Sequence, residues 1–274
     1  MTSGNDRAER LRPVQHWFLD LDGTTYLGGE PLPGALPLIE HFRRSGTGFT
    51  FLTNNSSRSS REYAVKLSRM GFPVTSENVF TSGQATAGYL ARTHPEASVY
   101  LLGTPAFAAE LGAAGISVVE DRPDFVVLGF DPDLDFARLT RACSFLREGS
   151  RYLASHPDAN CPVAGGYIPD AGSVMALIEA STGRRPEEVV GKPNRRFIEE
   201  AAAAAGVDLS RCAMVGDRLE TDVEMALTVG IPGVLVLSGA TRADDARLGR
   251  SPWREEVEVV SGLDGLLESL EVRG

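Results

Sequence analysis

The sequence lacks several features that mark particular classes of protein. No apolar run in its 274 residues approaches the length needed to span a bilayer, which argues against a membrane protein. The formal net charge is −10 and the basic residues form no run, so nucleic acid is not an expected partner. The three cysteines are odd in number, far apart and without CxxC spacing, which predicts reduced thiols in a cytoplasmic protein.

Lysine is also scarce, because only two of the 27 basic residues, Lys66 and Lys192, are lysine. Lys192 lies in the tripeptide Gly191-Lys192-Pro193. Arginine cannot replace lysine where a compact ammonium group must reach into a narrow site, so a binding role for Lys192 is one interpretation. The alternative is chance, since Lys66 occupies an ordinary polar helix.

The stretch that follows the first predicted strand carries two carboxylates. An apolar run from Val14 to Leu19 predicts a short buried strand, and Asp20 and Asp22 come directly after it. Side chains alternate along a strand, so the two carboxylates share a face. Close carboxylates repel each other unless a cation or a shared proton relieves them, and oxygen ligands without clustered His or Cys suit magnesium. The alternative is a strand end with the turn chemistry of Asp-Gly.

Strand and helix patterns alternate along the remaining chain, which predicts an α/β fold with a mostly parallel sheet. A polar stretch rich in Pro and Gly, His156 to Gly172, predicts a loop. Three further polar groups stand at the ends of predicted strands or helices: Thr53 with Asn54 and Asn55, Lys192, and Asp217 with Asp222. The carboxyl ends of parallel strands meet at one sheet edge, so we expect these groups to converge. For Thr53 and Asn54, and for Asp222, the alternative is a plain helix N-cap.

In this order, the four groups resemble the four motifs of the haloacid dehalogenase-like (HAD) hydrolase superfamily: DxDGT, a strand-end Thr or Ser, a Lys, and GDxxxTD. Further stretches resemble the branch that contains 4-nitrophenyl phosphatases, phosphoglycolate phosphatases and the NagD-like nucleotide or sugar phosphatases. These stretches are Phe18 to Gly28, Leu52 to Ser57, Thr81 to Thr86, Pro169 to Gly183, Gly191 to Pro193 and Gly216 to Asp222. The resemblance covers nearly the whole chain after its first dozen residues.

The resemblance implies a Rossmann-like parallel-sheet core with a smaller α/β cap domain inserted between the second and third motifs. We expect the core at residues 13–82 and 184–274, and the cap, which determines substrate specificity, at 83–183. Residues 1–12 are polar and charged and predict a flexible tail. Relatives of this branch often dimerise through the cap, so a homodimer of that kind is an expectation.

The resemblance also assigns roles to the acidic residues. Asp20 is expected to be the nucleophile that forms an aspartyl-phosphate, and Asp22 the acid and then the base. Magnesium is expected to bind Asp20, the backbone carbonyl of Asp22, and Asp217. Asp222 is expected to orient Asp217 or a metal-bound water.

The same resemblance implies that Thr53, the N–H group of Asn54 and the Lys192 ammonium bind the phosphoryl oxygens. Asn55, which lies beside them in the sequence, is a further candidate. Two stretches depart from the family's pattern. Ala154 to Asp158 resembles ATNPD with His156 in place of Asn, and Pro169 to Ser173 resembles PGxGS with Asp170 in place of Gly. His156 is a candidate for binding a charged leaving group, and an ordinary hydrogen-bonded loop histidine is the alternative.

The implied activity is magnesium-dependent hydrolysis of phosphomonoesters of small metabolites, namely phosphoglycolate, glycerol phosphate, a sugar phosphate or a nucleotide. A phosphotransferase or phosphomutase on the same core is the nearest alternative. A non-catalytic protein that binds a phosphorylated ligand would be expected to have lost a catalytic residue, and none of the four motifs has.

Overall fold

The computed structural model describes residues 11–163, 165–249 and 256–271, so most of the predicted tail at 1–12 lies outside the described residues. The chain divides into two compact units. The first unit comprises Met1–Leu52, Tyr63–Val79 and Ala201–Gly274, and the second comprises Thr53–Glu62 and Phe80–Glu200. Residues 53–62, 80–82 and 184–200, which we expected with the catalytic core, therefore group with the second unit. Leu11, expected in the tail, is buried in the core of the first unit.

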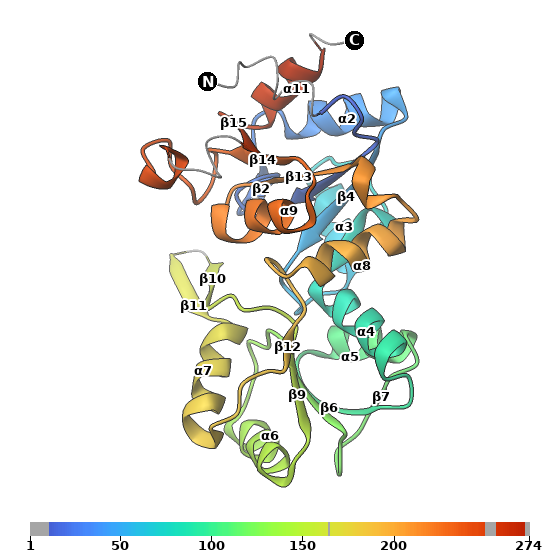
Figure 1. The fold of residues 1–274 in the computed structure, drawn as a ribbon, viewed down its shortest axis with the longest axis vertical. Helices are drawn as coiled ribbons and strands as arrows, with labels where there is room; N and C mark the ends of the chain where they lie inside the picture. The colour runs from blue at the N-terminus through green and yellow to red at the C-terminus, as the bar shows by residue number, and fades with distance from the viewer. Residues whose placement is uncertain (1–10, 164, 250–255, 272–274) are drawn as a thin grey trace. The chain divides into compact units, whose positions relative to one another are not determined.

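The first unit is built on a six-stranded sheet with the order β15-β14-β13-β1-β4-β5. Figure 1 labels β15, β14, β13 and β4 of this sheet. Its strands are β1 (His16–Asp20), β4 (Gly48–Thr53), β5 (Val79–Thr81), β13 (Cys212–Gly216), β14 (Gly233–Val236) and β15 (Val257–Val260). β1 pairs in parallel with β13 on one side and β4 on the other. The central place of β1 sets its carboxyl end between two parallel neighbours, where ligands of such sheets bind.

Helices and turns complete this unit. They are α2 (Ala35–Ser45), α9 (Glu224–Val229), α11 (Leu263–Glu271), the short β2 (Tyr26–Leu27) and β3 (Glu30–Pro31), and the helical turns at Leu209–Arg211, Leu219–Val223 and Ala246–Gly249. α3 (Ser60–Arg69) and α8 (Arg195–Ala205) are divided between the two units. The same holds for the last residue of β4, Thr53, and for Phe80 and Thr81 of β5, which group with the second unit. α2 lies beside α11 in Figure 1. α2 buries Ala35, Leu38, Ile39 and Phe42, which is the spacing of one helical face, and it ends where Gly46 adopts a left-handed conformation.

Aromatic packing fixes the core beneath the central strand. Trp17 on β1 stacks on Phe42 of α2, with ring centroids 5.7 Å apart. Phe49 and Phe51 on β4 continue the cluster edge to face. Because β1 is buried on both faces, its apolar run is the signature of a central parallel strand, as the sequence predicted.

The second unit has its own parallel sheet of five strands, in the order β12-β9-β8-β6-β7. The strands are β6 (Ser98–Leu102), β7 (Ser117–Val118), β8 (Phe125–Leu128), β9 (Arg151–Ala154) and β12 (Glu188–Val189). Its helices are α4 (Ser82–Thr93), α5 (Pro105–Ala113), α6 (Phe136–Glu148) and α7 (Ala171–Thr182), while the turn at Ser76–Asn78 that precedes β5 belongs to the first unit. Two parallel sheets with helices confirm the predicted α/β class.

The stretch from His156 to Gly172 is not the plain loop that the sequence predicted. It contains an antiparallel hairpin of β10 (Asn160–Val163) and β11 (Gly166–Pro169). Proline in both strands and glycine in β11 hid the pattern, because these residues are depleted from strands except at edges and turns. Among the described residues, no helix is long and apolar enough to cross a membrane.

Candidate active site

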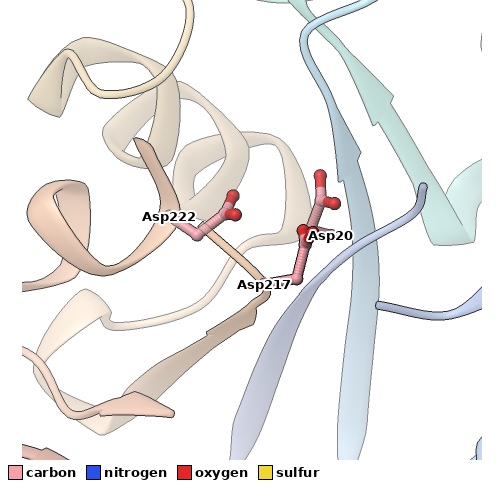
Figure 2. A group of neighbouring side chains, drawn as sticks. All are labelled: Asp20, Asp217 and Asp222. Carbon is pink, nitrogen blue, oxygen red and sulfur yellow. The ribbon is translucent and has the colours of Figure 1, made fainter. Parts of the chain in front are cut away.

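Two aspartates of the first unit meet because their strands are neighbours. Asp20 is the last residue of β1, and Asp217 follows Gly216 at the end of β13. The two strands run in parallel, with Leu19 opposite Val215, so both carboxylates stand at the same edge of the sheet. Figure 2 shows the two side chains close together, with Asp222 beside them.

Asp222 joins the pair from the π-helical turn Leu219–Val223. Ligand oxygens of Asp20, Asp217 and Asp222 all lie within 4.8 Å of one another. Asp217 is 2% exposed and Asp222 is 1% exposed. Two buried carboxylates and the partly exposed Asp20 carboxylate repel one another at this distance unless a cation is present, and an all-oxygen donor set fits a hard ion such as Mg²⁺. The expected metal ligands Asp20 and Asp217 are therefore brought together, and the Asp222 carboxylate lies within the same 4.8 Å.

Backbone and hydroxyl groups hold Asp217 in this position. The Thr24 hydroxyl donates to its Oδ1 at 3.3 Å, and the Ala240 N–H donates to its Oδ2 at 2.6 Å. Gly23 of the DxDGT motif has φ of +90°, and a Cβ there would lie 2.5 Å from Asp217 Oδ2. Only glycine fits this close turn, so the motif glycine makes room for the carboxylate.

Asp22 stands apart from this group, because its side chain is exposed and is held by a residue whose role the sequence did not reveal. The Tyr26 hydroxyl donates to Asp22 Oδ2 at 2.9 Å. The Tyr26 side chain is fully buried, and burial together with the Asp22 charge holds the pKa of its hydroxyl far above the ordinary value. The Gly23 N–H donates to the Tyr26 carbonyl at 2.9 Å, which closes the turn. One oxygen of an exposed carboxylate is thus anchored by a buried phenol.

Lys66 contributes to this arrangement, contrary to our interpretation of it as an ordinary polar residue. Its ammonium lies 3.9 Å from the centroid of the Tyr26 ring, which is cation–π geometry. The signal that could have found Tyr26 is its place inside the motif stretch, although nothing in the spacing tells which way its hydroxyl points.

Asn54 is the centre of the second unit's polar cluster. Its Oδ1 accepts from the Lys192 N–H at 2.8 Å, and its Nδ2 donates to the Lys192 carbonyl at 3.1 Å. Nδ2 also donates to Asp158 Oδ2 at 3.1 Å. The Ser82 hydroxyl donates to the Asn54 carbonyl. The side-chain amide is consumed by these bonds, so a ligand of Asn54 would meet its backbone N–H.

Thr53 and Asn55 flank Asn54 and have different surroundings. Thr53 is the buried last residue of β4, and its hydroxyl accepts from the Asn55 N–H at 3.2 Å. Asn55 Oδ1 accepts from the Ser57 N–H at 2.9 Å and from the Ser57 hydroxyl at 2.6 Å. This is the side-chain turn that Asn favours in loops, so the Asn55 amide shapes the loop.

His156 is fully buried, and both of its ring nitrogens have partners. Nδ1 lies 2.8 Å from the Ser155 hydroxyl, and Nε2 lies 2.9 Å from Asp170 Oδ1. The histidine thus has the ordinary hydrogen bonds that we gave as the alternative. Its partner Asp170 is the other residue at which the chain departs from the family's pattern.

The predicted site residues therefore fall into two groups, one in each unit. The first unit brings together Asp20, Asp217 and Asp222, with Asp22 two residues after Asp20. The second unit brings together the remaining candidates, which are Thr53, Asn54, Asn55, Lys192 and His156.

Comparisons with known proteins identify the family. Residues 17–117 match a model of haloacid dehalogenase-like hydrolases, and residues 189–265 match a second, HAD-hydrolase-like model. An acid sugar phosphatase of Staphylococcus epidermidis is 31% identical over 243 residues, 88% of this chain and 93% of that protein. A dihydroxyacetone phosphatase of Corynebacterium glutamicum is 34% identical over 87% of this chain and 86% of its own length.

Solved structures agree with these relatives. A 4-nitrophenylphosphatase of Thermotoga maritima matches with a TM-score of 0.88 and 43% identity, covering 94% of this chain and 98% of that one. A glycerol phosphate phosphatase of Mycobacterium tuberculosis, solved with magnesium, matches with a TM-score of 0.86 and 36% identity, covering 94% and 78%. A putative NagD protein matches at 42% identity with a TM-score of 0.87. The chain belongs to the haloacid dehalogenase-like hydrolases, in the branch of 4-nitrophenyl phosphatases and NagD-like proteins.

Proposed function

We propose that this protein is a magnesium-dependent phosphatase that hydrolyses phosphomonoesters of small metabolites through an aspartyl-phosphate on Asp20. The observation that carries the proposal is the group of Asp20, Asp217 and Asp222 at the carboxyl ends of β1 and its neighbour β13. A nucleophilic carboxylate beside two buried carboxylates is suited to a reaction in which a cation and a phosphoryl group share one site.

In the first step, an Asp20 oxygen attacks phosphorus and the bond from phosphorus to the ester oxygen breaks. Asp22 gives its proton to that oxygen, which leaves as an alcohol. The anchoring of Asp22 Oδ2 by the Tyr26 hydroxyl supports this role, because Oδ1 is left to face the leaving group in a fixed orientation.

In the second step, Asp22 takes a proton from water, and the resulting hydroxide attacks phosphorus. The bond from phosphorus to the Asp20 oxygen breaks, which regenerates the carboxylate and releases inorganic phosphate. After Asp22 has given up its proton in the first step it is a carboxylate, which can act as the base in the second step, so one residue serves both steps.

Asp20, Asp217 and Asp222 would hold Mg²⁺, together with the backbone carbonyl of Asp22, and Asp222 would at the least orient the others. When bound, the ion neutralises negative charge on the carboxylates and the phosphoryl oxygens. We assign Thr53, the Asn54 N–H and the Lys192 ammonium to the phosphoryl oxygens, on the family resemblance of the stretches that contain them.

The relatives' names include phosphatases for sugar phosphates, dihydroxyacetone phosphate, glycerol phosphate and 4-nitrophenyl phosphate. The substrate that we propose is accordingly a small phosphorylated metabolite, with phosphoglycolate and nucleotides also to be tested. A homodimer formed through the predicted cap, residues 83–183, remains part of the proposal, as does a cytoplasmic location.

A phosphometabolite panel tests this function directly. Purified protein is assayed for release of inorganic phosphate with Mg²⁺ and with excess chelator, and kcat/KM is compared across the panel. We expect metal-dependent release from at least one small ester. Transfer to an added sugar that exceeds release to water would instead indicate a phosphotransferase. Absence of both across the panel would overturn the proposal.

A further inference from the structure

His156 and Asp170 form a buried pair in the second unit. His156 is fully buried and Asp170 is 4% exposed, and Nε2 lies 2.9 Å from Oδ1. Asp170 is also the N-cap of α7, where its Oδ1 accepts from the Ala171 N–H at 2.6 Å. The pair therefore joins the start of α7 to the segment that contains His156. Such a buried pair is costly to split, because either partner alone is left polar and desolvated.

A chain of hydrogen bonds leads from the other ring nitrogen of His156 through two serine hydroxyls. The Ser155 hydroxyl lies 2.8 Å from His156 Nδ1, and the Ser56 hydroxyl lies 3.1 Å from the Ser155 hydroxyl. The Phe130 N–H donates to the Ser56 hydroxyl at 2.9 Å. A neutral His156 protonated on Nε2 satisfies every member, since each hydroxyl then donates toward the ring and the ring donates to the carboxylate. Because Ser155 and His156 are fully buried, this chain of bonds cannot serve as a nucleophilic triad.

The backbone around His156 contacts the Gly191-Lys192 segment directly. The Gly191 N–H donates to the Ser155 carbonyl at 2.8 Å. A Cβ on Gly191 would lie 2.6 Å from the Ser155 carbonyl oxygen and 2.9 Å from His156 Cβ. The same Cβ would lie 2.7 Å from Asn54 Oδ1. Movement of the Ser155–His156 backbone must therefore move Gly191 and the residue that follows it.

That following residue is Lys192. Its backbone N–H and its carbonyl both form hydrogen bonds with the side-chain amide of Asn54. Asn54 is bonded in turn to Asp158, two residues after His156. The start of α7 closes the same segment, since the Gly172 N–H donates to the Asp158 carbonyl at 2.8 Å. The segment that contains His156 is thus hydrogen-bonded both to Asn54 and to the residue that precedes Lys192.

We propose that His156 and Asp170 are matched positioning residues, which fix the segment Ser155–Asp158 and through it the phosphate-binding residues Asn54 and Lys192. This inference rests on the proposed function only for the role of Asn54 and Lys192. The aspartate supplies the acceptor that a buried histidine needs, and the histidine supplies the donor that a buried aspartate needs.

A double-mutant cycle tests the match. The variants are His156→Asn, Asp170→Gly and the double variant that carries both substitutions. His156→Asn leaves Asp170 buried without its ring donor, and Asp170→Gly leaves the ring without its acceptor. The double variant leaves neither group, and glycine is a tolerable N-cap for α7. Asp170→Asn is the conservative variant, because its amide oxygen still accepts from Nε2.

The readouts are KM for a hydrolysed ester and the competitive inhibition constant of inorganic phosphate, with kcat and Tm measured alongside. We expect each single variant to raise KM and the phosphate inhibition constant about tenfold, with a smaller change in kcat, and the double variant to return within about threefold of the wild type. Asp170→Asn should also stay within about threefold. Ser173→Ala is the matched control, since it removes a bond from the same helix start to the Ala159 carbonyl and should change Tm alone.

Two results would overturn the inference while the wild type still hydrolyses esters. One is phosphate inhibition that stays at the wild-type value in folded single variants. The other is additive loss in the double variant, because additive loss means that the two residues do not act as a pair. If the single variants fail to fold, Asp170→Asn and the double variant provide the test. A tenfold rise of the phosphate inhibition constant in both of them would contradict the proposal that His156 and Asp170 act as a pair. A wild type that hydrolyses no ester refutes the proposed function instead.

Discussion

The hydroxyl of Tyr26 offers a test of how Asp22 is oriented. Tyr26→Phe removes the 2.9 Å bond to Asp22 Oδ2 and keeps the buried ring beneath the Lys66 ammonium. A hydrogen bond to a charged group is worth about 1.5–3 kcal/mol, but water can replace the lost donor on the exposed Asp22 carboxylate. We therefore expect the free energy of unfolding to fall by only about 1 kcal/mol.

The catalytic effect should depend on the leaving group. Acid catalysis typically contributes ~10²–10⁴-fold, so losing the orientation of the acid should cost about 10–100-fold in kcat/KM for an alkyl ester such as glycerol phosphate. The 4-nitrophenolate ion departs with little need of a proton, so 4-nitrophenyl phosphate should lose about threefold or less. The assay compares kcat/KM for the two esters, since this ratio covers the steps up to loss of the first product, in which Asp22 acts as the acid.

Tyr152→Phe is the matched control, because it removes a buried tyrosine hydroxyl in the second unit. It should leave both kcat/KM values unchanged. Equal losses for both esters in Tyr26→Phe would show that Tyr26 acts through the fold and not through the acid. Unchanged activity with both esters would show that the orientation of Asp22 does not depend on Tyr26.

Three further results are expected. Burial lowers the pKa of His16 to about 4, so between about pH 6.5 and 4 the unfolded chain takes up a proton that the folded chain does not. The free energy of unfolding should therefore fall by up to about 3 kcal/mol as the pH is lowered over this range. Denaturant titration measures this decline, and His16→Gln should flatten it. Tyr152→Phe should raise the free energy of unfolding by about 1 kcal/mol, because no hydrogen-bond partner of its hydroxyl exists among the described residues. Mg²⁺ should raise the Tm of the wild type, and Asp217→Asn should abolish that shift.

Each of these results has a clear contrary outcome. A stability profile that His16→Gln leaves unchanged between pH 6.5 and 4 would mean that another group binds the proton. Lower stability of Tyr152→Phe would show that the hydroxyl is bonded after all. A Tm shift by Mg²⁺ that survives in Asp217→Asn would place the ion away from the three aspartates.

The meeting of Asp20 and Asp217 could be predicted from the sequence because it follows from local patterns. Each residue ends an apolar run, and apolar runs between helices form parallel strands whose carboxyl ends share an edge. β1 and β13 are neighbours, and their register leaves the two aspartates side by side. Strand geometry predicted the shared edge, and the resemblance to the family's motifs predicted that these two aspartates meet there.

Contacts between distant side chains could not be predicted in the same way. His156 and Asp170 are 14 residues apart, and Asn54 is 138 residues from Lys192. No periodicity links such positions, so the sequence offered His156 as a ligand-binding candidate and left Asp170 without a role. The hairpin of β10 and β11 was missed because its prolines and glycines resemble those of a loop.

The central claim is that Asp20 is the nucleophile of a metal-dependent phosphatase. Asp20→Asn changes one side-chain atom type, and the bond from the Thr25 hydroxyl to the Asp20 carbonyl does not involve that side chain. With Mg²⁺ and 4-nitrophenyl phosphate, we predict that release of phosphate falls by about a thousandfold or more in a folded variant. Undiminished turnover by Asp20→Asn would contradict the account.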